Sequence, residues 1–157
     1  MDNIRGNIIV EMSKKEIGIQ ENPPGSNKQK YGEWFGINGQ PWCGMFVSYI
    51  YDKSGYLLNL RDFLLGFCNC QRAYLEFMKN GEIVTEPEPG DIVFYDFPPH
   101  ERMEHCGIFL KKINSLSFIA IEGNTFTIAS PHNGIVGIKF RSYTDSIFVH
   151  PTKSIKG

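Results

Sequence analysis

The sequence lacks the features that mark several common classes of protein. No apolar run approaches the ~20 residues that a membrane-spanning helix needs. The N-terminal stretch MDNIRGNIIVEMSKK is too interrupted by charge to be a signal peptide. The 16 basic and 17 acidic residues nearly cancel, and no dense Lys/Arg cluster offers a surface for nucleic acid or an anionic membrane. We therefore expect no nucleic-acid partner and no membrane insertion.

Cysteine is also scarce, with Cys43, Cys68, Cys70 and Cys106 as the only four. Four cysteines with this uneven spacing are too few for a disulfide framework in a chain of this length, so we expect reduced thiols. A chain of 157 residues can bury a hydrophobic core without such staples. Together with the absence of repeats or linkers, this predicts a single domain over 1–157, which we expect to be a monomer.

Hydrophobic periodicity divides the chain into a helical part and a strand-rich part. Helical spacing predicts a helix between Ile4 and Gly18, a short helix within KQKYGEWFG, a helix from Cys43 to Gly55 and another in CQRAYLEFMKN. Period-two patterns predict five strands, in DIVFYDF, HCGIFLKK, SLSFIAIEG, IVGIKFR and SIFVH. The order predicts an α+β fold, with helices in about 1–82 packed on an antiparallel sheet of about five strands in about 88–151.

The stretch PWCGMFVSY raises the question of what Cys43 does. The residue lies where a loop becomes a helix, and a helix N-terminus lowers the pKa of a thiol and favours the nucleophilic thiolate. A single cysteine at a helix start is nevertheless more often a small buried hydrophobe. A catalytic role for Cys43 therefore requires a base from elsewhere in the chain.

Among the four histidines, His105 is the best candidate for that base. His100, His132 and His150 lie beside prolines in loops or at a strand end, as expected of surface residues. His105 instead opens the strand HCGIFLKK, which the short connection KINS joins to the next strand. These two strands should therefore form a hairpin.

Counting along this hairpin places a polar side chain beside His105. If the two turn residues are 113–114, His105 lies opposite Glu122; if they are 114–115, it lies opposite Asn124. Glu122 and Asn124 are two residues apart and share one face of the sheet. In either register, a carboxylate or an amide lies close to the imidazole.

These residues define a mechanism of amide hydrolysis. His105 takes the proton of the Cys43 thiol, and Glu122 or Asn124 holds the imidazole in the productive tautomer. The thiolate attacks an amide carbonyl, while the backbone N–H of Cys43 helps to stabilise the oxyanion. His105 then protonates the leaving amine, and water releases the acyl group from the thioester.

Four blocks, WCGMFVSY, PEPGDIVFYDF, HCGIFL and IEGNT, occur in an order and spacing that resemble the CHAP family of cysteine, histidine-dependent amidohydrolases/peptidases. This family is papain-like, needs no cofactor for catalysis and cleaves amide bonds in bacterial peptidoglycan. The resemblance extends from about NKQKYGEWFG to the last strand. It implies Cys43 as nucleophile, His105 as general base, Glu122 as orienting residue and Asn124 as an accompanying polar group. It further implies that Trp42 contributes to substrate binding as a wall of the cleft.

The chain departs from the family pattern at some positions. Glu104 stands where the family often has Asp, and Cys106 stands where it has a hydrophobe. Some members bind calcium in an acidic loop before the cysteine, but here that region contains Glu33 alone, so we expect no metal site. No wall-binding module follows the last strand. The resemblance thus implies a phage lysin, a virion-associated hydrolase or a bacterial effector that other machinery delivers to the cell wall.

Two non-catalytic functions compete with this interpretation. Cys68, Cys70, His105 and Cys106 offer four ligands for zinc, but their spacing fits no CxxC-type pattern, and adjacent strand residues point to opposite faces. Small buried hydrophobes are the simpler interpretation of the three cysteines other than Cys43. The second competitor is a catalytically inactive domain that binds the cell wall. The residues also leave open whether an enzyme would be an N-acetylmuramoyl-L-alanine amidase or an endopeptidase.

Overall fold

The computed structural model describes residues 3–58, 60, 65–152 and 155–156. The helices are α1 (Asn3–Lys15), α2 (Lys30–Phe35), α3 (Cys43–Lys53) and α4 (Cys70–Lys79). The main sheet contains β2 (Ile83–Val84), β3 (Ile92–Tyr95), β4 (His105–Lys112), β5 (Ser117–Thr125), β6 (Ile135–Ser142) and β7 (Ser146–Val149). A 3-10 turn, η1 (Tyr143–Asp145), joins β6 to β7, and β1 (Tyr56–Leu57) pairs with β8 (Ile155–Lys156) as a separate small sheet.

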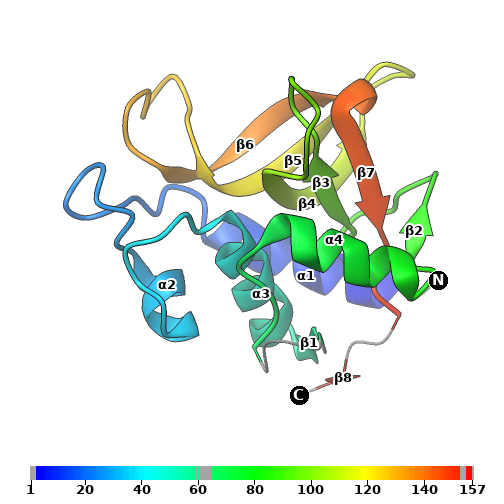
Figure 1. Ribbon diagram of the computed structural model, residues 1–157, viewed down its shortest axis with the longest axis horizontal. Coiled ribbons are helices and arrows are strands. Elements are labelled where there is room, and N and C mark those ends of the chain that lie inside the picture. The colour runs from blue at the N-terminus through cyan, green and yellow to red at the C-terminus, as the bar shows by residue number, and fades with distance from the viewer. Residues whose placement is uncertain (1–2, 59, 61–64, 153–154, 157) are drawn as a thin grey trace.

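The main sheet has the strand order β2-β7-β3-β4-β5-β6, and every pair in it is antiparallel. Helices α1, α3 and α4 lie together on one side of this sheet (Figure 1). The predicted α+β class, the four helices and the five longer strands are confirmed. The sheet has six strands, however, because the two-residue strand β2 pairs with the end of β7. An element this short has no periodicity from which it could be predicted.

Alternation along the strands produces two apolar clusters on opposite faces of the sheet. In β3, Ile92 and Phe94 pack against the helices, whereas Val93 and Tyr95 belong to a second cluster on the other face. Phe109 and Phe118 join Val93 and Tyr95 in that second cluster. Both faces are therefore covered, as expected for strands with nearly continuous apolar sequence.

Helix α3 is the centre of the helical layer. Eight of its eleven residues are buried, and the helix packs on both β4 and β5. Before it, the fully buried Trp42 stacks on Tyr31 of α2, with 5.5 Å between ring centroids. The Nε1–H of Trp42 donates a hydrogen bond to Glu21. These contacts fix the position of the α3 N-terminus. None of the described helices is both long and apolar enough to cross a membrane.

The β4–β5 hairpin differs from the two-residue turn expected from sequence. The connection spans residues 113–116, where the backbone N–H groups of Ile113 and Asn114 both donate to the carbonyl of Ser117. A bulge then shifts the register between Phe109 and Lys111. Beyond the bulge, Ile108 pairs with Ile121, which is the register of the 114–115 turn. A longer loop and a bulge therefore produce one of the two predicted registers by a different route.

Gly123 allows α3 to lie directly on the sheet. A Cβ atom at this position would lie 2.5 Å from Cβ of Phe46 and 3.0 Å from the Trp42 ring, which is closer than real contacts allow. We predict that Gly123→Ala lowers the free energy of unfolding by about 1–3 kcal/mol, the usual cost of overpacking. Urea denaturation measures this loss. Lys112→Ala, on an exposed position of the same hairpin, is the control and should change stability by less than about 0.5 kcal/mol.

Candidate active site

Cys43 is the first residue of α3, and its side chain is almost entirely buried. One side of it lines a cavity of about 560 Å³ that Pro41, Cys70 and Met103 also line. The helix N-terminus directs its unpaired backbone N–H groups and the positive end of its dipole at this site. A thiolate at Cys43 is therefore stabilised by the helix and reachable from the cavity.

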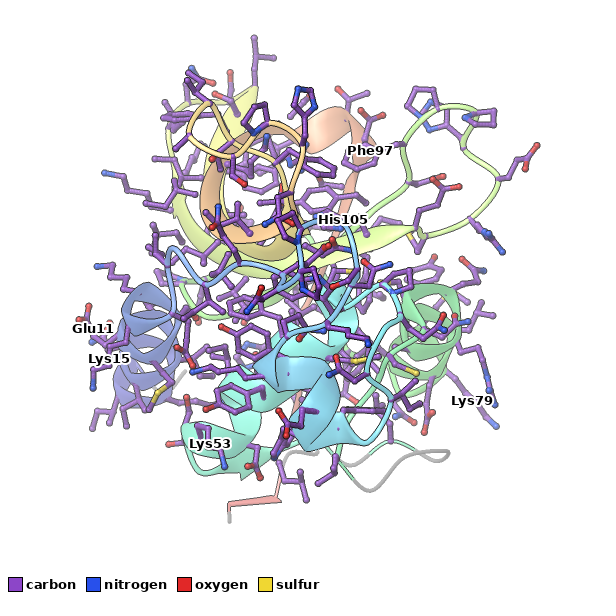
Figure 2. All side chains as sticks on the ribbon, turned by 90° about the vertical axis from the view of Figure 1, so that its left-hand side faces the viewer. Glu11, Lys15, Lys53, Lys79, Phe97 and His105 are labelled. Carbon is purple, nitrogen blue, oxygen red and sulfur yellow. The ribbon has the colours of Figure 1, made fainter. Side chains whose placement is uncertain are left out.

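His105 is the first residue of β4, and its ring lies at the junction between the sheet and the helical layer (Figure 2). Its Nε2 atom lies 2.7 Å from Oε1 of Glu122. The ring also stacks on Tyr95, with 5.7 Å between centroids. Because Nε2 is held by the carboxylate, Nδ1 is the nitrogen that remains for the hydrogen bond between His105 and Cys43.

Glu122 reaches His105 diagonally across the hairpin. In the observed register the residue opposite Glu122 is Gly107, where a Cβ atom would lie only 2.7 Å from Cγ of Glu122. The missing side chain of Gly107 leaves room for the carboxylate to extend towards the first residue of β4. The prediction that Glu122 accompanies His105 is confirmed, although the two residues are not directly opposite each other.

Arg141 on β6 completes this network, and the sequence analysis missed it. Its Nε–H donates to Oε2 of Glu122 over 2.8 Å, and its Nη2–H donates to Oε1 over 2.6 Å. The guanidinium lies over the rings of Tyr95 and Phe97, 5.0 and 5.1 Å from their centroids. Arg141 thus binds the buried carboxylate in the bidentate geometry that arginine prefers. Its only signal in the sequence was a basic residue on an otherwise apolar strand.

The electrostatics of the network favour a charged histidine and a charged glutamate. Burial alone would lower the pKa of His105, but the charge of Glu122 and the hydrogen bonds to Cys43 and Glu122 raise it to about 10. Burial would likewise raise the pKa of Glu122, yet the hydrogen bonds from Arg141 and the charge of His105 lower it to about 2. At neutral pH the structure therefore holds an imidazolium between a thiol and a carboxylate.

Two further thiols surround Cys43. Its Sγ atom lies 3.7 Å from Sγ of Cys70, the first residue of α4, and Cys106 of β4 contacts it as well. Hydrogen bonds from Cys106 and Cys70 lower the pKa of Cys43 well below its ordinary value against the effect of burial, and His105 adds to this. The interpretation of Cys70 and Cys106 as small buried residues is correct for their burial, but both also contact the nucleophile candidate.

Asn124 has a different environment from the one expected. It lies in the irregularity between Glu122 and Thr125 of β5, with a left-handed backbone (φ 53°) that interrupts the alternation of side chains. Its Oδ1 lies so close to Gly134 that a Cβ atom there would be only 2.6 Å away. The interactions found for the His105 ring within the described chain are with Glu122, Cys43, Tyr95 and Phe97. Asn124 therefore shapes the end of β5 near the site.

Trp42 does not form a wall of the cleft, contrary to the prediction. The whole residue is buried, with its ring between Tyr31 and neighbouring core side chains and its Nε1–H bonded to Glu21. A side chain without exposed surface cannot contact a substrate. The two amphipathic ends of tryptophan suit both a cleft and a core, so the residue type alone could not distinguish them. Trp42 instead supports the loop that presents Cys43.

Comparisons with known proteins identify no family for this chain. No protein-family model matches the sequence, and no curated protein matches it either. The chemistry of the site is therefore argued from its geometry. A thiol at a helix N-terminus, a histidine beside it and a carboxylate that orients the histidine are the parts of a cysteine-based nucleophile. The zinc ligands considered first, Cys68 with Cys70, His105 and Cys106, do not come together as a set, since Cys68 lies outside the thiol cluster of the described residues.

The two pKa shifts predict how stability depends on pH. The folded-state pKa of Glu122 is lowered from 4.5 to about 2, so its contribution is present above pH 4.5 and is lost as pH falls towards 2. The folded-state pKa of His105 is raised from 6.5 to about 10, so its contribution is present below pH 6.5 and is lost as pH rises towards 10. Stability should be greatest between these two limbs.

We predict that Arg141→Met moves the acid limb to higher pH and lowers the free energy of unfolding at pH 6 by about 3 kcal/mol, because a buried carboxylate loses one of its two cations. Chemical denaturation over a pH series measures both effects. Arg102→Met removes an exposed arginine near the cavity and should leave the profile unchanged. Equal acid limbs in the wild type and in Arg141→Met would contradict the role of Arg141.

We also predict that iodoacetamide alkylates Cys43 much faster than Cys68 at pH 6 in buffer containing a chelator. The pKa of Cys43 is lowered by its thiol and histidine neighbours, whereas burial raises the pKa of Cys68. The Cys43 rate should change little between pH 6 and pH 8, while the Cys68 rate should rise about tenfold per unit, in proportion to its thiolate fraction. Peptide mapping after timed quenching measures both rates. In His105→Ala the Cys43 rate should become pH-dependent, and its failure to do so would separate His105 from the thiol.

Proposed function

We propose that the chain is a cysteine-dependent amidase or peptidase that cleaves an amide bond in bacterial peptidoglycan. The observation that carries this proposal is the connected set of Cys43, His105 and Glu122, with the histidine bonded to the glutamate at 2.7 Å and to the thiol on its other side. The sequence resemblance to the CHAP family supports the choice of peptidoglycan as substrate.

The proposed fold is papain-like. In that architecture a helix presents the nucleophile, and an antiparallel sheet presents the base and its orienting residue. The position of Cys43 at the start of α3, with His105 on β4 and Glu122 on β5, is consistent with this arrangement. Its strand order and helix placement leave the nucleophile and the base on separate elements that meet at the cavity.

Catalysis begins from the thiolate of Cys43 and the imidazolium of His105. The thiolate attacks the amide carbonyl, and the tetrahedral oxyanion is stabilised by the backbone N–H of Cys43 at the helix N-terminus. His105 donates its proton to the leaving amine, and a thioester forms. His105, now neutral, removes a proton from water, which attacks the thioester and restores the thiolate. Glu122 maintains the ring orientation throughout.

The cavity beside Cys43 suits a polar, branched peptide. Its lining includes the arginines Arg72 and Arg102, the amides Asn69 and Gln71, and Glu104. Arginine side chains bind carboxylates well, and peptidoglycan stem peptides carry several free carboxylates. The proposed place of action is the cell wall, which a monomer would reach after release, with a virion or through other export machinery.

We predict that Cys43→Ala reduces the hydrolysis of purified peptidoglycan by at least about 10³-fold, as expected when a nucleophile is removed. Cys68→Ala is the matched control, because it removes a neighbouring thiol outside the cluster, and it should retain activity. Loss of turbidity measures the rate. Glu122→Gln should reduce it less than His105→Ala, since an orienting residue is easier to replace than a base.

Mass spectrometry of the soluble fragments identifies the bond. An amidase releases intact stem peptides with a free L-alanine amino group, whereas an endopeptidase leaves part of the stem attached to muramic acid. Hydrolysis that persists in Cys43→Ala, with the same fragments as the wild type, would overturn the mechanism.

A further inference from the structure

Three thiols form a compact cluster at the base of the cavity. The Sγ atoms of Cys43, Cys70 and Cys106 all lie within 4.8 Å of one another. They come from the start of α3, the start of α4 and the second position of β4, so distant parts of the chain converge there. The catalytic set of Cys43, His105 and Glu122 makes no use of two of these thiols. Their convergence calls for a separate explanation.

The spacing of the sulfur atoms matches that of a zinc site. Zinc binds thiolates at about 2.3 Å in tetrahedral geometry, which places the sulfur atoms roughly 3.8 Å apart. Sγ of Cys43 and Sγ of Cys70 are 3.7 Å apart. The Sγ of Cys106 lies within the 4.8 Å limit of both, a distance that a rotamer adjustment closes. Thiolates are also the ligand type that zinc prefers over harder cations.

The surroundings provide an entry path and a suitable charge. Cys43 and Cys70 line the 560 Å³ cavity, and Cys106 is fully buried behind them. One zinc ion with three thiolates carries a net charge of −1, and Arg72 and Arg102 line the same cavity. Their positive charge compensates this excess. The cavity also brings solvent to the open coordination position.

We propose that Cys43, Cys70 and Cys106 bind one Zn²⁺ ion, with water from the cavity as the fourth ligand. Each ligand binds as a thiolate, so the thiol protons leave to solvent when the metal enters. His105 is not part of this set, because its Nε2 is bonded to Glu122 on the other face of the sheet. The ligands therefore differ from a zinc module built on Cys68 and His105.

Bound zinc blocks the nucleophile. A Cys43 thiolate that coordinates zinc has its lone pair engaged and cannot attack a carbonyl, so the metal acts as a reversible inhibitor. This consequence rests on the proposed function, whereas the binding of zinc does not. The two can accordingly be tested separately.

The first experiment measures binding without any assay of activity. Reduced, metal-free protein is titrated with Zn²⁺ against a chromogenic chelator, and with Co²⁺, whose thiolate charge-transfer absorption reports sulfur ligands directly. We expect one ion per chain. Cys70→Ala and Cys106→Ala should weaken zinc binding by more than the ~10–100-fold that loss of an outer partner costs. Cys68→Ala is the matched control and should bind as the wild type does.

The second experiment uses the wild type alone, so it does not depend on whether a core variant folds. Alkylation with and without one equivalent of Zn²⁺ is followed by peptide mapping. Zinc should slow the reaction of Cys43 and Cys70 at least tenfold and leave the Cys68 rate unchanged. Absence of stoichiometric zinc, absence of thiolate bands with Co²⁺, or equal slowing of Cys68 would overturn the proposal.

Activity separates the two proposals. A protein that hydrolyses peptidoglycan but binds no zinc contradicts the metal site alone. A protein that binds zinc through these thiols but does not hydrolyse peptidoglycan contradicts the proposed function and leaves the site intact. When both hold, one equivalent of Zn²⁺ should inhibit hydrolysis, and a chelator should restore it.

Discussion

The buried carboxylate of Glu122 is the constraint on which the site depends. Its side chain is completely buried, and an isolated carboxylate in such a place costs several kcal/mol. Arg141 on β6 and His105 on β4 offset that cost from the two flanking strands of the sheet. The same contacts that keep the carboxylate charged also fix the ring of His105 and raise its pKa. Stability and chemistry are therefore joined in one ion network.

This network explains why the sheet carries glycine at two adjacent cross-strand places. Gly107 leaves space for the Glu122 side chain on one face, and Gly123 leaves space for Phe46 of α3 on the other. Without the first, the carboxylate could not extend towards His105. Without the second, the helix that carries Cys43 could not approach the sheet. The positions of base and nucleophile thus depend on absent side chains as much as on present ones.

The sequence predicted the local elements well because each depends on short-range patterns. Helix α3 and the hairpin strands follow from periodicity, and the pairing of Glu122 with His105 follows from counting residues across a hairpin. The bulge near Leu110 and the four-residue loop could not be predicted, because backbone hydrogen bonding decides them. Arg141 and Cys70 reach the site only through tertiary packing, which leaves no periodic trace in the chain. Trp42 was misplaced because its residue type suits both a core and a cleft.

The thiols around Cys43 show how one environment can serve two kinds of chemistry. Neighbouring S–H groups and an imidazolium stabilise a thiolate, which is what a nucleophile requires. A thiolate beside two further thiols is also what a soft metal ion prefers. An apolar residue at Cys70 or Cys106 would keep the core packed but would remove a donor from the thiolate. The arrangement that makes Cys43 reactive is thus physically the same one that makes it a metal ligand, and the free zinc concentration decides between the two states.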